Sequence, residues 1–267
     1  MTATAPTERF SSRVEDYVRH RPDYPPALLD WLRREHGVEA GWRVADIGAG
    51  TGISSRMFLQ AGHAVAAVEP NAAMRAAAVE ALSGFPGFRA VDGSAEATTL
   101  DDASVDLVSA AQAFHWFDPV RVRAEWARIL RPGGLAVVYW NSRRLSGTPF
   151  LAGYEALLSE YGTDYAAVAE RHPDDDAMRR WFGDGWRGSV VFPHAQSMDF
   201  AGLRGRLLSS SYAPQLGHPA HAPMLEALRR LFEATAEAGR VRLDYDTRAF
   251  VGTLDDATAP SSKEPLP

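Results

Sequence analysis

The sequence contains no cysteine. Disulfides, thiolate metal sites and a cysteine nucleophile are therefore excluded, and the absence fits a reducing compartment. No apolar run approaches the roughly 20 residues that a membrane-spanning helix needs. The first ten residues, MTATAPTERF, lack the apolar core of a secretory signal. We therefore expect a cytoplasmic protein with no membrane partner.

Positive charge is also scarce, because 28 Lys and Arg residues face 34 Asp and Glu residues, for a net charge of -6. Duplex nucleic acid would meet no broad basic field, so we expect no nucleic-acid partner. The histidines at 172, 194, 218 and 221 show no metal-ligand spacing, so we predict no metal site. The sequence does not set the oligomeric state.

The first half of the chain alternates short apolar stretches with helical ones. Strands are expected at residues 43–47, 64–68, 88–91, 105–110 and 135–140, and helices at 53–61, 72–82 and 120–130, the last stopped by Arg-Pro-Gly-Gly at 131–134. This alternation predicts an α/β fold with a mostly parallel sheet and helices on both faces.

The alternation breaks after Asn141. Helices are expected at 150–161, 175–182 and 225–238, and strands at 190–192 and 241–251. We predict a disordered arm (1–8), an α/β core with an N-terminal lid (9–142), a helical substrate cap with the closing strands (143–254) and a disordered tail (255–267).

A glycine-rich turn follows the first expected strand, in the pattern Asp-x-Gly-x-Gly-x-Gly from Asp46 to Gly52. Glycines allow a sharp turn and close approach to a ligand, and the next helix offers free N–H groups. The dinucleotide pattern Gly-x-Gly-x-x-Gly fails, because its third glycine would fall at Ile53. A ligand without phosphate but with an ammonium and a ribose diol suits an acid at this turn.

Acids also end the next two expected strands. Glu69 follows AVAAV, where a carboxylate can accept hydrogen bonds from both ribose hydroxyls, although a strand-end acid can also simply face solvent. Asp92 ends the third strand and could accept from an adenine amino group, but Asp-Gly is also a common turn.

Four segments in this order, VADIGAGTG, VEPNAAM, DGSAE and RPGGLAVV, together resemble the class I S-adenosylmethionine (SAM) dependent methyltransferases. The resemblance covers about residues 10–141. AQAFHWFD and YVRHRPDYP are similar to the small-molecule branch that includes trans-aconitate methyltransferase. The resemblance implies a Rossmann-like seven-stranded sheet in the order 3-2-1-4-5-7-6, with an antiparallel last strand at 241–251 and SAM as cofactor.

The resemblance also implies roles for individual residues along the cofactor. Gly48, Ala49 and Gly50 would line the methionine part and Asp46 its amino-acid end; Glu69 would hold the ribose; Pro70, Asn71 and Met74 would pack near the adenine; Asp92, Ser94, Ala95 and Glu96 would flank the base; Gln112 and Ala113 would approach the sulfonium.

Methyl transfer from a sulfonium is an in-line displacement, so alignment and exclusion of water are the main tasks. A base is needed only for some acceptors. His115 is the candidate, with pocket shaping as the alternative role. Candidate substrate contacts are Tyr17, Arg21 and Tyr24 in the lid, Trp116 beside the histidine, Asn141 after the fifth strand, and Ser211 and Tyr212, which follow Arg204 and Arg206.

The leading interpretation is methyl transfer to O, N or C of a small molecule. The alternatives are a non-catalytic SAM-binding or regulatory module and a dinucleotide-dependent enzyme on a Rossmann fold. A nucleic-acid methyltransferase is disfavoured by the acidic balance, and no Asn-Pro-Pro-Tyr-like tetrapeptide follows the fourth strand.

Overall fold

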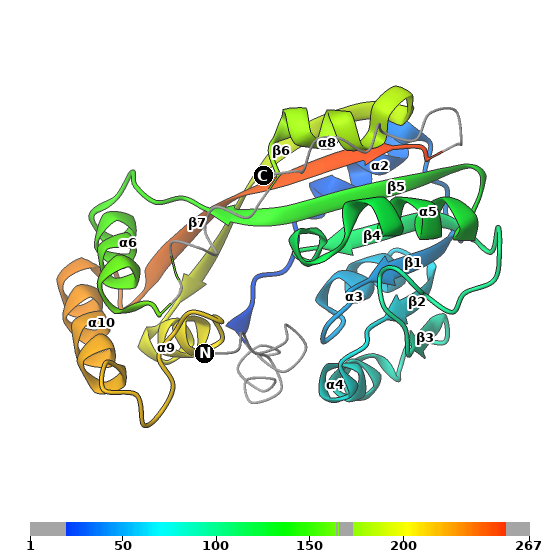
Figure 1. Cartoon of the computed structure of the whole chain (residues 1–267). Helices are drawn as coiled ribbons and strands as arrows, with labels where there is room; N and C mark the ends of the chain where they lie inside the picture. Colours follow the sequence, from blue (N-terminus) through cyan, green and yellow to red (C-terminus); the bar gives the residue numbers. More distant parts are fainter. Residues whose placement is uncertain (1–19, 164, 166–172, 255–267) are drawn as a thin grey trace.

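A computed structural model describes residues 20–163, 165 and 173–254. Seven strands form one sheet in the order β3-β2-β1-β4-β5-β7-β6 (Figure 1). They are β1 (Arg43–Ile47), β2 (Ala64–Val68), β3 (Phe88–Val91), β4 (Val105–Ala111), β5 (Leu130–Arg143), β6 (Trp186–Met198) and β7 (Val241–Gly252). β7 runs antiparallel to β5 and β6, and the other pairs are parallel. The predicted order and the antiparallel last strand are confirmed.

Helices cover both faces of the sheet, as predicted. The helices are α2 (Ala27–His36), α3 (Ile53–Gln60), α4 (Ala72–Leu82), α5 (Pro119–Ile129), α6 (Pro149–Tyr161), α8 (Asp175–Phe182), α9 (Phe200–Leu208) and α10 (His221–Thr235). Side chains along β5 alternate between two hydrophobic cores, as strand geometry requires. Val137 and Tyr139 join α2 and α3 on one face, whereas Val138 and Trp140 join α5 and α8 on the other.

Several elements differ from the sequence predictions, and three of the differences have a clear physical reason. β5 begins at Leu130 rather than 135, because Arg-Pro-Gly-Gly forms an irregularity within the strand and does not precede it. β6 is much longer than residues 190–192, since pairing with β7 supplies order that Gly188 and Pro193 obscure in the sequence. The pattern also missed α9, whose Gly202 and Gly205 weaken helix propensity but whose Leu203 and Leu207 are buried.

α6, α9 and α10 form a separate group at the carboxyl edge of the sheet (Figure 1). β5 pairs with β4 only as far as Tyr139, and its last four residues, 140–143, pair with β7 alone. The three helices share a third hydrophobic cluster with the start of β7, including Leu158, Leu207, Leu228 and Leu243. This group is called the cap helices below. α8 does not belong to it, because Met178 and Phe182 pack into the core of the sheet.

Some predictions concern residues outside the described ones, namely the arm at 1–8, the tail at 255–267 and the candidate Tyr17. In the described ranges no helix combines the length and apolarity needed to cross a membrane.

Candidate functional site

The glycine turn after β1 is held against its two neighbouring strands. The N–H groups of Gly48 and Ala49 donate to the carbonyl of Val68 at the end of β2, at 2.9 and 3.2 Å. A Cβ added at Gly48 would lie 2.7 Å from Cβ of Ala113 and 3.1 Å from Cζ of Phe117, so the loop after β4 packs directly on the turn. The turn therefore needs glycine for close approach as well as for its φ of +67°.

Glu69 joins the first two loops. One carboxylate oxygen accepts from the N–H of Gly50 and the other from the N–H of Asn71, both at 2.9 Å. The side chain is buried, and burial raises the pKa of Glu69, whereas these N–H groups and nearby Arg75 lower it. A buried carboxylate held by backbone donors has a fixed position and further acceptor capacity.

Asp46 lies beneath the turn with no exposed surface. One of its oxygens, Oδ2, accepts from the hydroxyls of Ser54 and Ser55 in the first turn of α3, at 2.5 and 2.6 Å. Burial raises the pKa of Asp46 to about 6, although these hydroxyls and that of Ser109 oppose the change. The other oxygen, Oδ1, has no hydrogen-bond partner among the described residues. A buried acceptor without a donor is costly unless a ligand supplies one.

Space remains in front of Gly50. A Cβ built there would meet only Sδ of Met74, at 3.9 Å, although its φ of +57° favours glycine. Asn71 caps α4 by accepting from the N–H of Met74 at 3.0 Å, and Pro70 between Glu69 and Asn71 is exposed. The predicted methionine and adenine contacts therefore lie together beside the turn.

The loops after β3 and β4 are tied to the same edge. Arg75 donates to the carbonyl of Glu69 at 2.7 Å and pairs with Asp92 at 3.0 Å, and the carboxylate of Asp92 is largely exposed. Glu96 accepts from the N–H of Asp118 at 3.1 Å. Between Asp92 and Glu96, Ser94 is half-buried and Ala95 is buried.

The loop after β4 carries the predicted sulfonium and acceptor contacts. Gln112 has a φ of +56°, which is rare for a non-glycine residue, and its side chain donates to the carbonyl of Asn141 at 3.2 Å. Phe114 is buried in the core, whereas His115 and Trp116 are half-buried with ring centroids 4.7 Å apart. A positive φ such as that of Gln112 strains the backbone, and strain of this kind is often found at functional sites.

The remaining substrate candidates do not share one location. The side chain of Asn141 donates to the carbonyl of Asp23 and accepts from Thr247. It therefore anchors the segment before α2, residues 20–26 (the N-terminal segment), to β7. Tyr24 packs edge-to-face on Tyr139, with centroids 4.7 Å apart. Ser211 and Tyr212 lie after α9 among the cap helices.

A cavity of about 420 Å³ connects the turn with the N-terminal segment and β6. Its lining includes Thr51 and Ile53 from the turn side, Arg21 and Asp23 from the segment, and Gln196 from β6. Arg21 also donates to the carbonyl of Ser209 at 2.9 Å, at the end of α9. The candidate Arg21 thus lies between the glycine turn and a cap helix.

Sequence reasoning missed Arg75 and the pair Ser54 and Ser55. The two serines open the helix directly after the glycine turn, which was the available signal, whereas nothing in the sequence links Arg75 to Asp92. No group of three His, Asp or Glu residues suited to a metal ion occurs in the part of the chain that the structure describes.

Comparisons with known proteins agree with this architecture. Residues 45–138 match the model of a family described as a methyltransferase domain. An uncharacterized methyltransferase of Mycobacterium tuberculosis is 46% identical over 50% of this chain and 52% of its own length. An uncharacterized methyltransferase-like protein of Schizosaccharomyces pombe is 28% identical over 93% of this chain and 96% of its own.

Solved structures share the fold. A protein assigned as a type II methyltransferase from Anaeromyxobacter dehalogenans has a TM-score of 0.65 at 23% identity, covering 88% of this chain and 98% of that one. A phosphoethanolamine N-methyltransferase of Haemonchus contortus, bound to phosphomonomethylethanolamine and S-adenosylhomocysteine, has a TM-score of 0.54 at 15% identity, covering 91% of this chain and 57% of that one.

The sheet order and the glycine turn with its two acids define a Rossmann-like fold of the methyltransferase type. With the match of residues 45–138 to the methyltransferase-domain family, they show that this chain contains a methyltransferase domain. The aligned region spans about half the length of the mycobacterial relatives, at 52%.

Packing at the base of the turn gives a stability test with a matched control. Gly52 and Gly62 have φ values of +84° and +88°, but an added Cβ at Gly52 would lie 2.5 Å from Cδ1 of Leu82, whereas at Gly62 nothing lies within 4 Å. In both alanine variants the left-handed backbone should lower the free energy of unfolding by about 1–2 kcal/mol. Gly52→Ala should lose roughly 1–3 kcal/mol more through overpacking against α4. Urea unfolding measures both, and equal losses would contradict this packing.

Proposed function

We propose that this chain transfers a methyl group from SAM to a small-molecule acceptor. The observation that carries the proposal is the pair of buried acids at the glycine turn. Glu69 is fixed by two backbone N–H groups, and Asp46 has an oxygen without a donor among the described residues. The ammonium and the ribose hydroxyls of SAM are donors from which these carboxylates can accept further hydrogen bonds.

The residues around the turn suit the rest of the cofactor. The open space at Gly50 allows an adjacent ligand backbone, and buried Met74 offers an apolar contact for a base. In this proposal Gly48 and Ala49 contact the methionine part, and Asp46 faces its amino-acid end directly or through water. Glu69 holds the ribose, Ser94, Ala95 and Glu96 flank the adenine, and Gln112 and Ala113 face the sulfur. Asp92 is not among these contacts, because its carboxylate is exposed and paired with Arg75.

When bound, SAM supplies a methyl group on a positively charged sulfur, which is already activated as a leaving group. The chain then has to orient the acceptor and exclude water. The loop after β4 contacts the glycine turn through Ala113 and Phe117, which brings its half-buried residues His115 and Trp116 to the same edge of the sheet. We assign His115 and Trp116 to the acceptor side.

The cap helices complete this arrangement on the opposite side of the N-terminal segment. Arg21 lines the cavity beside the turn and donates to the end of α9. We propose that the acceptor enters between this segment, the loop after β4 and the cap helices, so that residues 143–254 serve as a substrate cap as well as closing the sheet.

Cofactor binding through Glu69 can be tested by calorimetry with S-adenosylhomocysteine. Glu69→Gln removes the charge but keeps the shape, and should weaken binding by about 1.5–3 kcal/mol, the value of hydrogen bonds to a charged group. Gly50→Ala should weaken it as well, because the added methyl group occupies the open space, where its one protein neighbour is Sδ of Met74 at 3.9 Å, and because its φ of +57° strains an alanine. Glu80→Gln on the exposed side of α4 is the control. Unchanged affinity for S-adenosylhomocysteine in both folded site variants would contradict cofactor binding at this turn.

The role of His115 can be tested once a screen of small molecules has found an acceptor. If His115 is a general base, His115→Ala should lower kcat about 10²–10⁴-fold, whereas a positioning role should raise KM for the acceptor. In either case affinity for S-adenosylhomocysteine should stay unchanged. Exposed His218→Ala is the matched control. Wild-type kinetics in His115→Ala and His115→Gln would exclude His115 from the acceptor side.

A further inference from the structure

Arg206 on α9 is a buried guanidinium with only 6% of its surface exposed. Its Nε donates to the hydroxyl of Tyr245 on β7 at 3.2 Å, and its Nη1 donates to the hydroxyl of Ser210 at 3.0 Å. The hydroxyl of Tyr245 passes the hydrogen bond on to Gln196 on β6. Arginine stays protonated in proteins, so this side chain carries a full positive charge inside the cap.

Among the described residues no carboxylate pairs with Arg206. The nearby Arg143, at the carboxyl end of β5, shows the contrast, because it pairs with Glu155 and also donates to the hydroxyl of Tyr165 at 2.7 Å. The guanidinium of Arg143 also lies over the ring of Tyr154, 5.1 Å from its centroid. Glu155 thus compensates the charge of Arg143, whereas among the described residues no carboxylate compensates that of Arg206.

Such an arrangement is costly for the protein alone. Hydroxyl groups satisfy donors but do not neutralise a charge, and a buried charge is normally paired. A guanidinium has five N–H donors, of which two are used here by the tyrosine and serine hydroxyls. The planar fork favours carboxylate and phosphate oxygens above other partners.

The position of Arg206 suits an acceptor rather than a remote ligand. The N-terminal segment packs on α9 here, since a Cβ added at Gly205 would overlap His20, and Arg21 donates to the carbonyl of Ser209. The same segment is anchored to β5 through Asn141 and lines the cavity beside the glycine turn. The guanidinium is linked to this region through Tyr245 and Gln196, since Gln196 accepts from Tyr245, donates to the carbonyl of His20 and lines the cavity beside the glycine turn.

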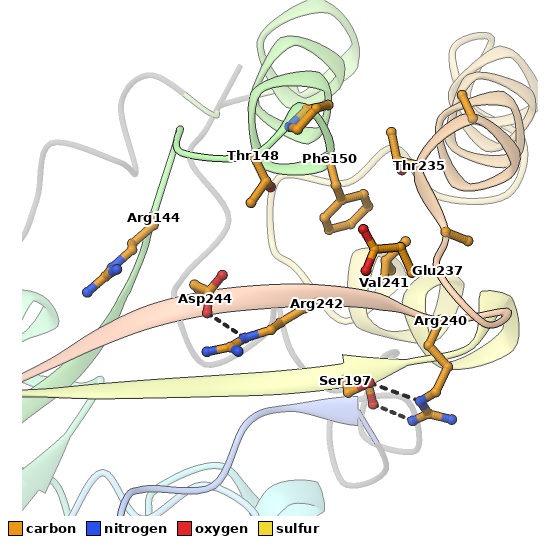
Figure 2. A pocket seen from close by; sticks show the side chains of 13 residues that line it. Arg144, Thr148, Phe150, Ser197, Thr235, Glu237, Arg240, Val241, Arg242 and Asp244 are labelled. Atoms are coloured by element: carbon orange, nitrogen blue, oxygen red, sulfur yellow. Dashed lines mark hydrogen bonds and ion pairs between the residues drawn. The ribbon is translucent and has the colours of Figure 1, made fainter.

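The largest cavity described in the cap differs in its charge balance. It has a volume of about 820 Å³ and lies between α6, α10 and the start of β7 (Figure 2). Arg242 on its wall pairs with Asp244, and Arg144 pairs with Asp246. A third arginine on the wall, Arg240, donates to Ser197, and the carboxylate of Glu237 lines the same cavity. Three carboxylates, those of Glu237, Asp244 and Asp246, therefore balance the three arginines of this cavity in number.

We propose that Arg206, with Arg143 beside it, binds an anionic oxygen group of the acceptor, either a carboxylate or a phosphate monoester. The inference rests on the proposed methyltransferase function and narrows its substrate class to anions. Arg206 is a binding residue in this account, and Tyr245 and Ser210 hold its fork in place.

Thermal melting of the full chain tests the proposal with defined probes at constant ionic strength. The probes are succinate and glycerol 3-phosphate, and the neutral counterparts are succinamide and glycerol, each with and without S-adenosylhomocysteine. At least one anion should raise the melting temperature of the wild type above its neutral counterpart, and which anion does so distinguishes carboxylate from phosphate. Arg206→Met should raise the dissociation constant of that anion about tenfold or more.

Two further variants keep the test decisive. Exposed Arg242→Met removes an arginine from the larger cavity and should leave the anion effect unchanged. If Arg206→Met does not fold, Arg206→Lys keeps the charge without the planar fork and should still weaken binding. The proposal is overturned if neither anion exceeds its neutral counterpart in the wild type, or if the folded Arg206 variant responds like the wild type. If S-adenosylhomocysteine does not bind the wild type, the proposed methyltransferase function is contradicted instead. The measurements without S-adenosylhomocysteine test anion binding separately from that outcome.

Discussion

The carboxylate of Glu69 holds two loops of the sheet in one arrangement, and the rest of the site depends on it. It accepts from the N–H of Gly50 after β1 and from the N–H of Asn71 after β2. Because the side chain is buried, these bonds form in a poorly solvated environment where they constrain geometry strongly. Asp46 provides the second fixed acid directly beneath the same turn.

The sheet topology explains why these groups meet. β1 lies between β2 and β4, so the loops after all three strands emerge at the same edge, next to the point where the strand order reverses. Close packing of Gly48 on Ala113 then brings the loop that carries His115 against the turn. On the other side of that edge, the extended part of β5 and the long pairing of β6 with β7 carry the cap helices.

Much of the core could be predicted from the sequence, because local signals there agree with the global fold. The strand at 43–47, the glycine turn and the acid at Glu69 follow each other at short spacing, and the structure has them as expected. The cap was less predictable. The bonds of Asn141 to Asp23 and Thr247, and the position of Arg206 against Tyr245, join residues far apart in the chain. No periodicity or short motif encodes contacts of that kind.

The same difference explains the misjudged boundaries. Arg-Pro-Gly-Gly reads locally as a helix stop before a new strand, but pairing with β4 absorbs it into β5. Asn141 was predicted to follow the fifth strand and to contact the substrate, but it lies within β5, and its side chain bonds to the N-terminal segment and β7. In both cases tertiary pairing decides what the local pattern leaves open.

The central claim is that the two buried acids at the glycine turn hold a SAM-type cofactor. A crystal structure of this chain grown with S-adenosylhomocysteine tests it most directly. The account predicts the ribose hydroxyls on the carboxylate of Glu69 and the ammonium on the side of the turn where Asp46 lies. Ligand density at another edge of the sheet, or a bound ligand that leaves both carboxylates without a new contact, would contradict it.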